Sequence, residues 1–466
     1  MNLISDYKNF LNNGKTEREC CAFIAEQARK NGYKDITEVS SLKAGDKVYV
    51  TKWGKTIALF NIGTDDIANG MNILGAHIDS PRLDVKQNPI YEKDFVVYLN
   101  THYYGGIKKY QWVTMPLAIH GVVCKKDGTV VNVTVGEEEN DPVFCIADIL
   151  PHLAQKQMKE AASDFIPGEN LDVIVGSRNP DRQYASENEE TEKEEKDAKS
   201  QKDAAKKAVL AILKEKYGIV ESDLGSAELE VVPAGKARDL GFDRSLILGY
   251  GQDDRSCAFA SFVAMMESEA EKRTNVCLCV DKEEIGSVGA TGMASHFFEN
   301  AVAEVVARIA SGSSASSSGN PNASYSELTV RRALNNSNML SSDVNAAFDP
   351  MNTDLYDRDN SSFLGGGIVF NKYTGSRGKS GASDASPEFI ARLRKVLDDA
   401  GVKYQMAELG KVDQGGGGTI AYLAAKYGMY VLDAGVPVLS MHAPWEITSA
   451  EDMQQAFNAY KAFLKI

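Results

Sequence analysis

Four apolar runs along the chain each end in an acidic residue or a histidine, and this repeated layout constrains the fold more than any other feature. Between them lie stretches with helical apolar spacing, near residues 254 to 272, 289 to 310, 384 to 400 and 415 to 427. Alternating strands and helices predict an α/β domain. In an open sheet of this kind the carboxyl ends of the strands gather along one edge, where ligands bind. The runs are NILGAHID (72–79), CLCVDKEEIGS (277–287), NMLSSD (338–343) and VPVLSMH (436–442).

Two histidines and several carboxylates fall at these strand ends. Taken singly, a histidine there is more often a structural residue, and paired acids are more often a solvated turn. Carboxylates that follow buried strands are costly, however, unless they are paired or bind a cation. Imidazole and carboxylate without thiolate favour a hydrolytic zinc, manganese or cobalt site over a structural one. The candidates are His77, Asp79, Glu283, Glu284, Asp343 and His442, joined by Asp253 of GYGQDDRS just before a helical stretch.

The pattern of apolar and polar residues changes between residues 92 and 234. Runs such as DFVVYLNTHYYGG, PLAIHGVV and TVVNVTV look like half-exposed strands. A chain of 466 residues is also too long for one ordinary core. We therefore expect an α/β domain formed by residues 1–91 and 235–466, interrupted by an inserted β-rich domain at 92–234. The first helix of the α/β domain should begin at the capping box formed by Thr16 and Glu19.

The charge and composition limit the partners and the compartment. A formal net charge of −14 argues against nucleic acid or an anionic membrane as the main partner. The first residues lack the features of a secretory signal, and no run of eighteen apolar residues occurs. Seven cysteines without a CxxC pair indicate reduced thiols in the core. These features predict a cytoplasmic protein that binds neither nucleic acid nor membrane.

Six motifs in order along nearly the whole chain resemble the aspartyl aminopeptidase and vacuolar aminopeptidase I family, including its bacterial members. They are AHIDSPRLDVK, THYYGG, GQDDRSCA, DKEEIGSVGATG, SSDVNAAFDP and SMHAPWEITS. The resemblance implies a two-metal aminopeptidase acting on peptides. It implies a three-layer α/β/α phosphorylase/hydrolase-like catalytic domain with an inserted β-rich dimerisation domain. It also implies a homododecamer built from dimers.

The resemblance further implies a role for each candidate residue. His77 and Asp343 would hold one divalent ion, expected to be zinc, with manganese or cobalt as alternatives. Glu284 and His442 would hold the second ion, and Asp253 would bridge the two. Glu283 falls on the general base, Asp79 on the carboxylate that orients the first histidine, and His152 of ILPHLA on a histidine that acts across a subunit interface.

The sequence departs from better-known members of that family at several points. The bridging segment reads DDR rather than DN, so Asp254 would do the work of the asparagine. The substrate-pocket stretches also diverge, which leaves acidic and neutral N-terminal residues open as substrates. Candidate cations for an acidic side chain are Lys372, Arg377, Lys379 and Lys411, which read equally well as surface residues. Two rival functions are a related two-metal amidohydrolase or deacylase, and a catalytically silent scaffold that the intact Glu283 and Glu284 disfavour.

Overall fold

The chain divides into two compact units, which are described separately. A computed structural model describes residues 2–177, 203–314, 325–375 and 377–466. Unit 1 consists of Met1–Ser80 and Lys236–Ile466, and unit 2 consists of Pro81–Gly235. The expected boundary at residue 92 falls inside strand β5 (Arg82–Lys93). Because β5 pairs with β6 (Val96–Tyr104) from its first residue to its last, the whole strand belongs to unit 2.

Unit 1 is built on a nine-stranded mixed sheet. Its central strands β13, β4, β14 and β18 run parallel to one another, so their carboxyl ends meet at the same edge. Antiparallel strands flank them on both sides. In sheet order the strands are β1 (Lys34–Asp35), β2 (Lys47–Lys52), β3 (Thr56–Asn61), β13 (Thr274–Val280), β4 (Met71–His77), β14 (Asn338–Ser341), β18 (Tyr430–Gly435), β16 (Ile368–Asn371) and β17 (Tyr404–Met406).

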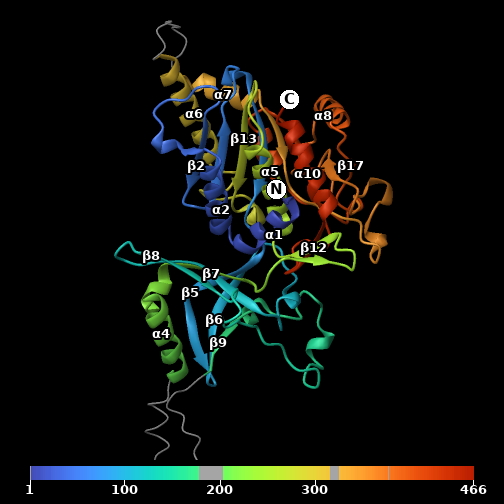
Figure 1. Ribbon diagram of the computed structural model, residues 1–466. Helices are drawn as coiled ribbons and strands as arrows, with labels where there is room; N and C mark the ends of the chain where they lie inside the picture. The colour runs from blue at the N-terminus through green and yellow to red at the C-terminus, as the bar shows by residue number, and fades with distance from the viewer. Residues whose placement is uncertain (1, 178–202, 315–324, 376) are drawn as a thin grey trace, which may run out of the picture. The chain divides into compact units, whose positions relative to one another are not determined.

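Helices cover both faces of this sheet (Figure 1). Along β4, Leu74 and Ala76 belong to one hydrophobic cluster while Ile73 belongs to another, because successive side chains of a strand point to opposite faces. The first cluster contains side chains of α1 (Leu3–Asn13), α2 (Glu17–Lys30), α5 (Gln252–Met266), α8 (Pro387–Asp399) and α10 (Ala450–Phe463). The second contains side chains of α6 (Phe297–Ser314), α7 (Glu327–Asn335) and α9 (Ala421–Ala425).

Local sequence signals explain where several of these elements begin and end. The predicted capping box is present, since the side chain of Thr16 accepts from the main-chain N–H of Glu19 and the side chain of Glu19 accepts from that of Thr16. The helix that begins there is α2, however, because α1 precedes it. The helix expected near 415 to 427 is reduced to the five residues of α9, because four glycines at 415–418 disfavour helix. The strand expected in VPVLSMH is limited to β19 (Pro437–Val438), which pairs with β15 (Asn345–Ala346).

A small antiparallel sheet completes unit 1 and matters for the site. It consists of β11 (Arg238–Leu240), β12 (Leu246–Gly249) and β20 (Glu446–Ser449), with β12 in the middle. Gly249 of β12 lies opposite Glu446 of β20. This pairing brings the segment before α5 next to the segment that follows His442.

Unit 2 is β-rich, as its sequence texture predicts. Its six strands form an antiparallel sheet in the order β8 (Val130–Val135), β7 (Leu117–Cys124), β10 (Ala227–Pro233), β5, β6 and β9 (Val173–Gly176). Helix α4 (Ala204–Tyr217) lies beside this sheet, and the main-chain N–H of Lys206 donates to the carboxylate of Glu92. Among the described residues of the whole chain, no helix is both long enough and apolar enough to cross a membrane.

Candidate active site

His77 is delivered by the end of β4, a strand with all seven residues buried. The imidazole is 2% exposed. Its Nδ1 lies 3.1 Å from the main-chain oxygen and 3.3 Å from Oδ1 of Asp79. Its Nε2 lies 3.2 Å from Oδ1 of Asp253 and 4.0 Å from Oδ1 of Asp343, which follows the neighbouring strand β14. The ring is therefore fixed on one side and faces two carboxylates on the other.

Asp253 lies between the two histidines that the sequence singles out. While its Oδ1 faces His77, its Oδ2 lies 3.3 Å from Nε2 of His442. The same Nε2 is 3.7 Å from Oε2 of Glu284. Two groups of possible metal donors result, each with its donor atoms within 4.8 Å of one another, and Asp253 belongs to both. The groups are His77, Asp253 and Asp343, and Asp253, Glu284 and His442.

Asp79 has two roles in this geometry. The first is the contact with His77, which the sequence predicts. In addition, its Oδ1 accepts from the main-chain N–H of Glu283 and its Oδ2 accepts from that of Glu284, both at 3.1 Å. These bonds hold the turn Glu283–Ile285, which lies between Lys282 and a glycine that both have positive φ. One buried carboxylate thus contacts the imidazole and accepts from the main chain of both glutamates.

The electrostatics of the cluster favour a cation. Burial raises the pKa of Glu283 to about 7, although His77 opposes the shift, and burial also raises the pKa of Glu284 and of Asp343 well above their ordinary values. Burial would raise the pKa of Asp253 too, but the two imidazoles outweigh it and the pKa is lowered. Oε1 of Glu284 is buried and has no hydrogen-bond partner among the described residues.

A divalent ion fits this donor set. Carboxylate oxygens and imidazole nitrogens are the ligands of hydrolytic zinc, manganese and cobalt sites. The positive charge of such an ion would offset the excess of buried carboxylates and use the unpartnered oxygen of Glu284. The chemistry of the residues present therefore agrees with metal binding.

Glu446 is a residue of the site that sequence reasoning missed. It is 1% exposed, and its Oε1 accepts from the main-chain N–H of His442 at 2.8 Å while its Oε2 accepts from that of Asp253 at 3.1 Å. Burial raises its pKa to about 8. The only signal was an acidic residue inside a short strand-like stretch. Asp254, expected to support the bridging segment, accepts from the main-chain N–H of His77 at 3.3 Å.

His152 lies in unit 2 and not in the unit that carries the other site residues. The segment after Pro151 forms consecutive turns rather than a helix, and His152 is exposed there. Large apolar side chains around it are also exposed, namely Ile149, Leu150, Leu153 and Met158.

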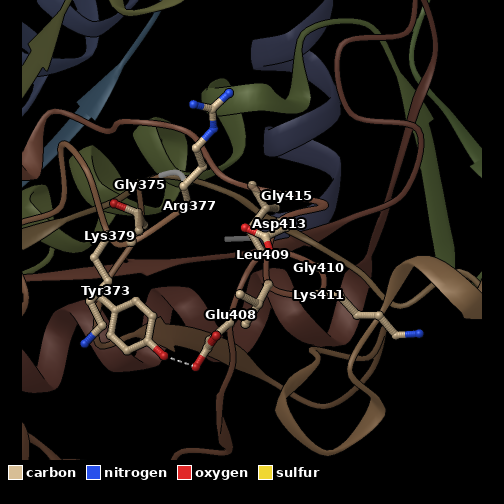
Figure 2. A pocket seen from close by; sticks show the side chains of 13 residues that line it. Tyr373, Gly375, Arg377, Lys379, Glu408, Leu409, Gly410, Lys411, Asp413 and Gly415 are labelled. Atoms are coloured by element: carbon tan, nitrogen blue, oxygen red, sulfur yellow. Dashed lines mark hydrogen bonds between the residues drawn. The ribbon is translucent and has the colours of Figure 1, made fainter.

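Three of the four candidate cations line one cavity of about 260 Å³ in unit 1. Figure 2 shows Arg377 and Lys411 extending away from the other labelled side chains. Lys379 lies over the ring of Tyr373, 3.7 Å from its centroid, and its Nζ is 3.6 Å from a carboxylate oxygen of Asp384. Glu408 lines the same cavity and accepts from the hydroxyl of Tyr373, so the lining carries both signs of charge. The fourth cation, Lys372, is exposed and is not among the lining residues.

Comparison with known proteins identifies the family. The family model described as "Aminopeptidase I zinc metalloprotease (M18)" matches residues 10–464. The chain belongs to this family. It is therefore a metal-dependent aminopeptidase, as the six motifs predict, and the family description agrees with a divalent metal at the donor cluster.

Several M18 relatives resemble the chain over nearly its full length. A probable M18 family aminopeptidase 1 of Clostridium acetobutylicum is 54% identical over 462 residues, covering 98% of this chain and 93% of that protein. The crystal structure of an M18 aminopeptidase from Thermotoga maritima has a TM-score of 0.89 at 40% identity, covering 99% of this chain and 95% of that one. A structure titled as the S. cerevisiae mApe1 dodecamer shares the fold, with a TM-score of 0.73 at 20% identity over 98% of this chain and 95% of that one.

Proposed function

We propose that the chain is a two-ion aminopeptidase in which Asp253 bridges the ions. His77 and Asp343 would complete the first ion's protein ligands, and Glu284 and His442 those of the second. The observation that supports this proposal is the position of the Asp253 carboxylate, with one oxygen facing each imidazole. Each imidazole also faces a carboxylate of its own beyond the shared Asp253, Asp343 for His77 and Glu284 for His442. Zinc is the expected metal, with manganese or cobalt as alternatives.

In this proposal Glu283 is the general base. Bound divalent ions supply Lewis acidity, which polarises the scissile carbonyl and lowers the pKa of the attacking water. The Glu283 carboxylate takes a proton from that water as the new C–O bond forms, and passes it to the leaving amine as the C–N bond breaks. In the metal-free chain burial raises the pKa of this carboxyl to about 7, and burial thus makes it a better proton acceptor than an exposed glutamate. Asp79 would keep Glu283 directed at the water and Glu284 directed at the ion, because it accepts from the main-chain N–H groups of both glutamates.

We further infer that unit 2 is the inserted dimerisation domain, that the catalytic unit is the three-layer α/β/α hydrolase-like fold, and that the enzyme assembles as a homododecamer. The exposed apolar side chains of Leu150, Leu153 and Met158 support an interface around His152. A partner's unit 2 would bring its histidine to the substrate. The yeast dodecamer, which shares the fold, is consistent with such an assembly.

We propose peptides with an acidic or a neutral N-terminal residue as substrates. Acids and cations share the cavity that holds Arg377, Lys379 and Lys411, so its lining gives an acidic side chain no large electrostatic advantage. A cytoplasmic location is supported by the seven cysteines, which are all free of disulfides, as is usual in a reducing compartment.

One experiment tests the function as a whole. The chelated protein is re-metallated with zinc, manganese or cobalt and assayed on Asp-, Glu-, Leu- and Lys-aminoacyl substrates and on N-acyl amino acids. We expect activity to return with at least one metal and to require a free α-amine. Cleavage of the N-acyl substrates alone would indicate a deacylase rather than an aminopeptidase. No activity with any of the metals would favour the catalytically silent scaffold.

A further inference from the structure

We propose that Glu446 is a positioning residue that holds the bridging aspartate and the second histidine at a fixed separation. A single carboxylate accepts from the main-chain N–H of both Asp253 and His442, at 3.1 and 2.8 Å. These two residues lie far apart in the chain, and the carboxylate joins their backbones directly. The inference deepens the proposed two-ion site and rests on it.

Neither of the joined backbones is held by regular structure. His442 has a φ of 64° and Asp253, with φ −80° and ψ 109°, lies outside the helical region although α5 begins one residue earlier. Gly251 has a φ of 68°, and a Cβ there would meet Nη1 of Arg255 at 1.8 Å. Without helix or sheet partners, the N–H groups of both ligands need another acceptor. Glu446 supplies it for both.

Glu446 is itself held on two sides. Its strand pairs with β12, where it lies opposite Gly249. The side-chain amide of Gln252 donates to the main-chain oxygen of Glu446 at 2.7 Å. Oε1 of Gln252 accepts in turn from the hydroxyls of Tyr7 at 3.0 Å and Thr448 at 2.5 Å. This buried network and the pairing with β12 hold the main chain from which the carboxylate of Glu446 extends.

The functional consequence concerns metal affinity. Groups that orient metal ligands typically change metal affinity by about 10- to 100-fold when they are lost. Glutamine at position 446 has one acceptor oxygen and an amide that donates, so it can serve only one of the two N–H groups. The other ligand backbone would lose its anchor, and the separation between Asp253 and His442 would no longer be fixed.

The chain offers a matched control in Asp452. Its carboxylate is also buried, at 0% exposed, and also accepts from two main-chain N–H groups, those of Gly365 and Gly367, both at 2.7 Å. Burial raises its pKa as well. None of its partners is a candidate metal ligand. Asp452→Asn therefore disturbs a clamp of the same design that does not hold the site.

The test compares zinc binding to the full-length wild type, Glu446→Gln and Asp452→Asn by competition with a chromophoric chelator, and thermal unfolding of each metal-free protein. Both variants should lose comparable metal-free stability, whereas only Glu446→Gln should lose about 10- to 100-fold in affinity for the more weakly held ion. Should Glu446→Gln not fold, Glu446→Asp takes its place, because its shorter carboxylate cannot reach both N–H groups.

Two results would overturn the inference. One is a zinc affinity within twofold of the wild type in the folded position-446 variant. The other is an equal loss of affinity in Asp452→Asn, which would show that general destabilisation is responsible. A wild type that binds a single zinc refutes the two-ion proposal instead, and the affinity ratio between the variants then still reports on Glu446.

Discussion

Replacing Glu283 by glutamine separates the chemistry of the site from its metal binding. The variant keeps the size of the side chain and removes its charge. Its backbone stays in place because Asp79 accepts from the main-chain N–H groups and not from the side chain. A general base contributes about 10²- to 10⁴-fold to the rate. We therefore expect kcat to fall by this factor with little change in the amount of bound zinc. At about 1.36 kcal/mol per tenfold change in rate, this corresponds to an activation barrier that is roughly 3–5 kcal/mol higher.

The assay pairs Glu283→Gln with its neighbour Glu284→Gln. Steady-state kcat on a Leu-aminoacyl substrate and zinc content by elemental analysis are measured for both. Glu284→Gln should lose metal as well as activity, because that carboxylate faces His442. In the loaded wild type the nearby cations lower the pKa of Glu283 from about 7, so the acid limb of kcat should lie below that pH. A Glu283→Gln enzyme that retains more than a tenth of wild-type kcat would refute the assignment.

Three further perturbations test other parts of the structure. Asp79→Asn leaves one buried main-chain N–H of the 283–284 turn without an acceptor and should cost about 1–3 kcal/mol of metal-free stability, measured by urea unfolding; unchanged stability would contradict the double clamp. Burial raises the pKa of Asp433 from 3.8 to about 6 in the folded chain, although the hydrogen bond from the hydroxyl of Thr419 acts to lower this pKa. Its carboxyl is thus protonated and stabilising below pH 4, and up to about 3 kcal/mol is lost as pH rises through 6. Asp433→Asn should remove this slope, and parallel stability curves for variant and wild type would count against it. His152→Ala should lower kcat by about 10²-fold, as loss of an oxyanion contact does, while light scattering shows the assembly intact; an unchanged kcat would remove the histidine from the mechanism.

The sequence predicts the fold best where a residue pattern is compatible with only one structural environment. The runs that became β4 and β13 are apolar nearly throughout, and all residues of both strands are buried, as expected for strands covered on two faces. His77 ends β4 and Glu283 follows the end of β13. Because parallel neighbours end at the same edge, these positions predicted that the two residues would meet. The layout of strand ends also grouped His442 and Asp253 with these residues, although β19 before His442 and β12 before Asp253 lie outside the nine-stranded sheet.

Other features depend on partners that are distant in the sequence. Glu446 begins a four-residue strand, and its importance comes from the main-chain N–H groups of His442, four residues earlier, and of Asp253, 193 residues away in the chain. No periodicity encodes such a contact. The sequence also predicts the boundary at residue 92 rather than at Pro81, because the first half of β5 carries polar residues that give no strand signal.

The turn that carries His442 has a consequence for stability engineering. Ser440 and His442 both adopt left-handed φ values, 58° and 64°, which non-glycine residues hold at a cost of about 1–3 kcal/mol each. A screen for thermostable variants of the metal-free protein would therefore reward glycine at either position and discard a proposed ligand in the process. A screen with zinc present would instead favour variants that keep His442, because zinc binding then stabilises the folded state. The left-handed turn therefore serves the site at a cost to stability, and selection for stability alone would remove it.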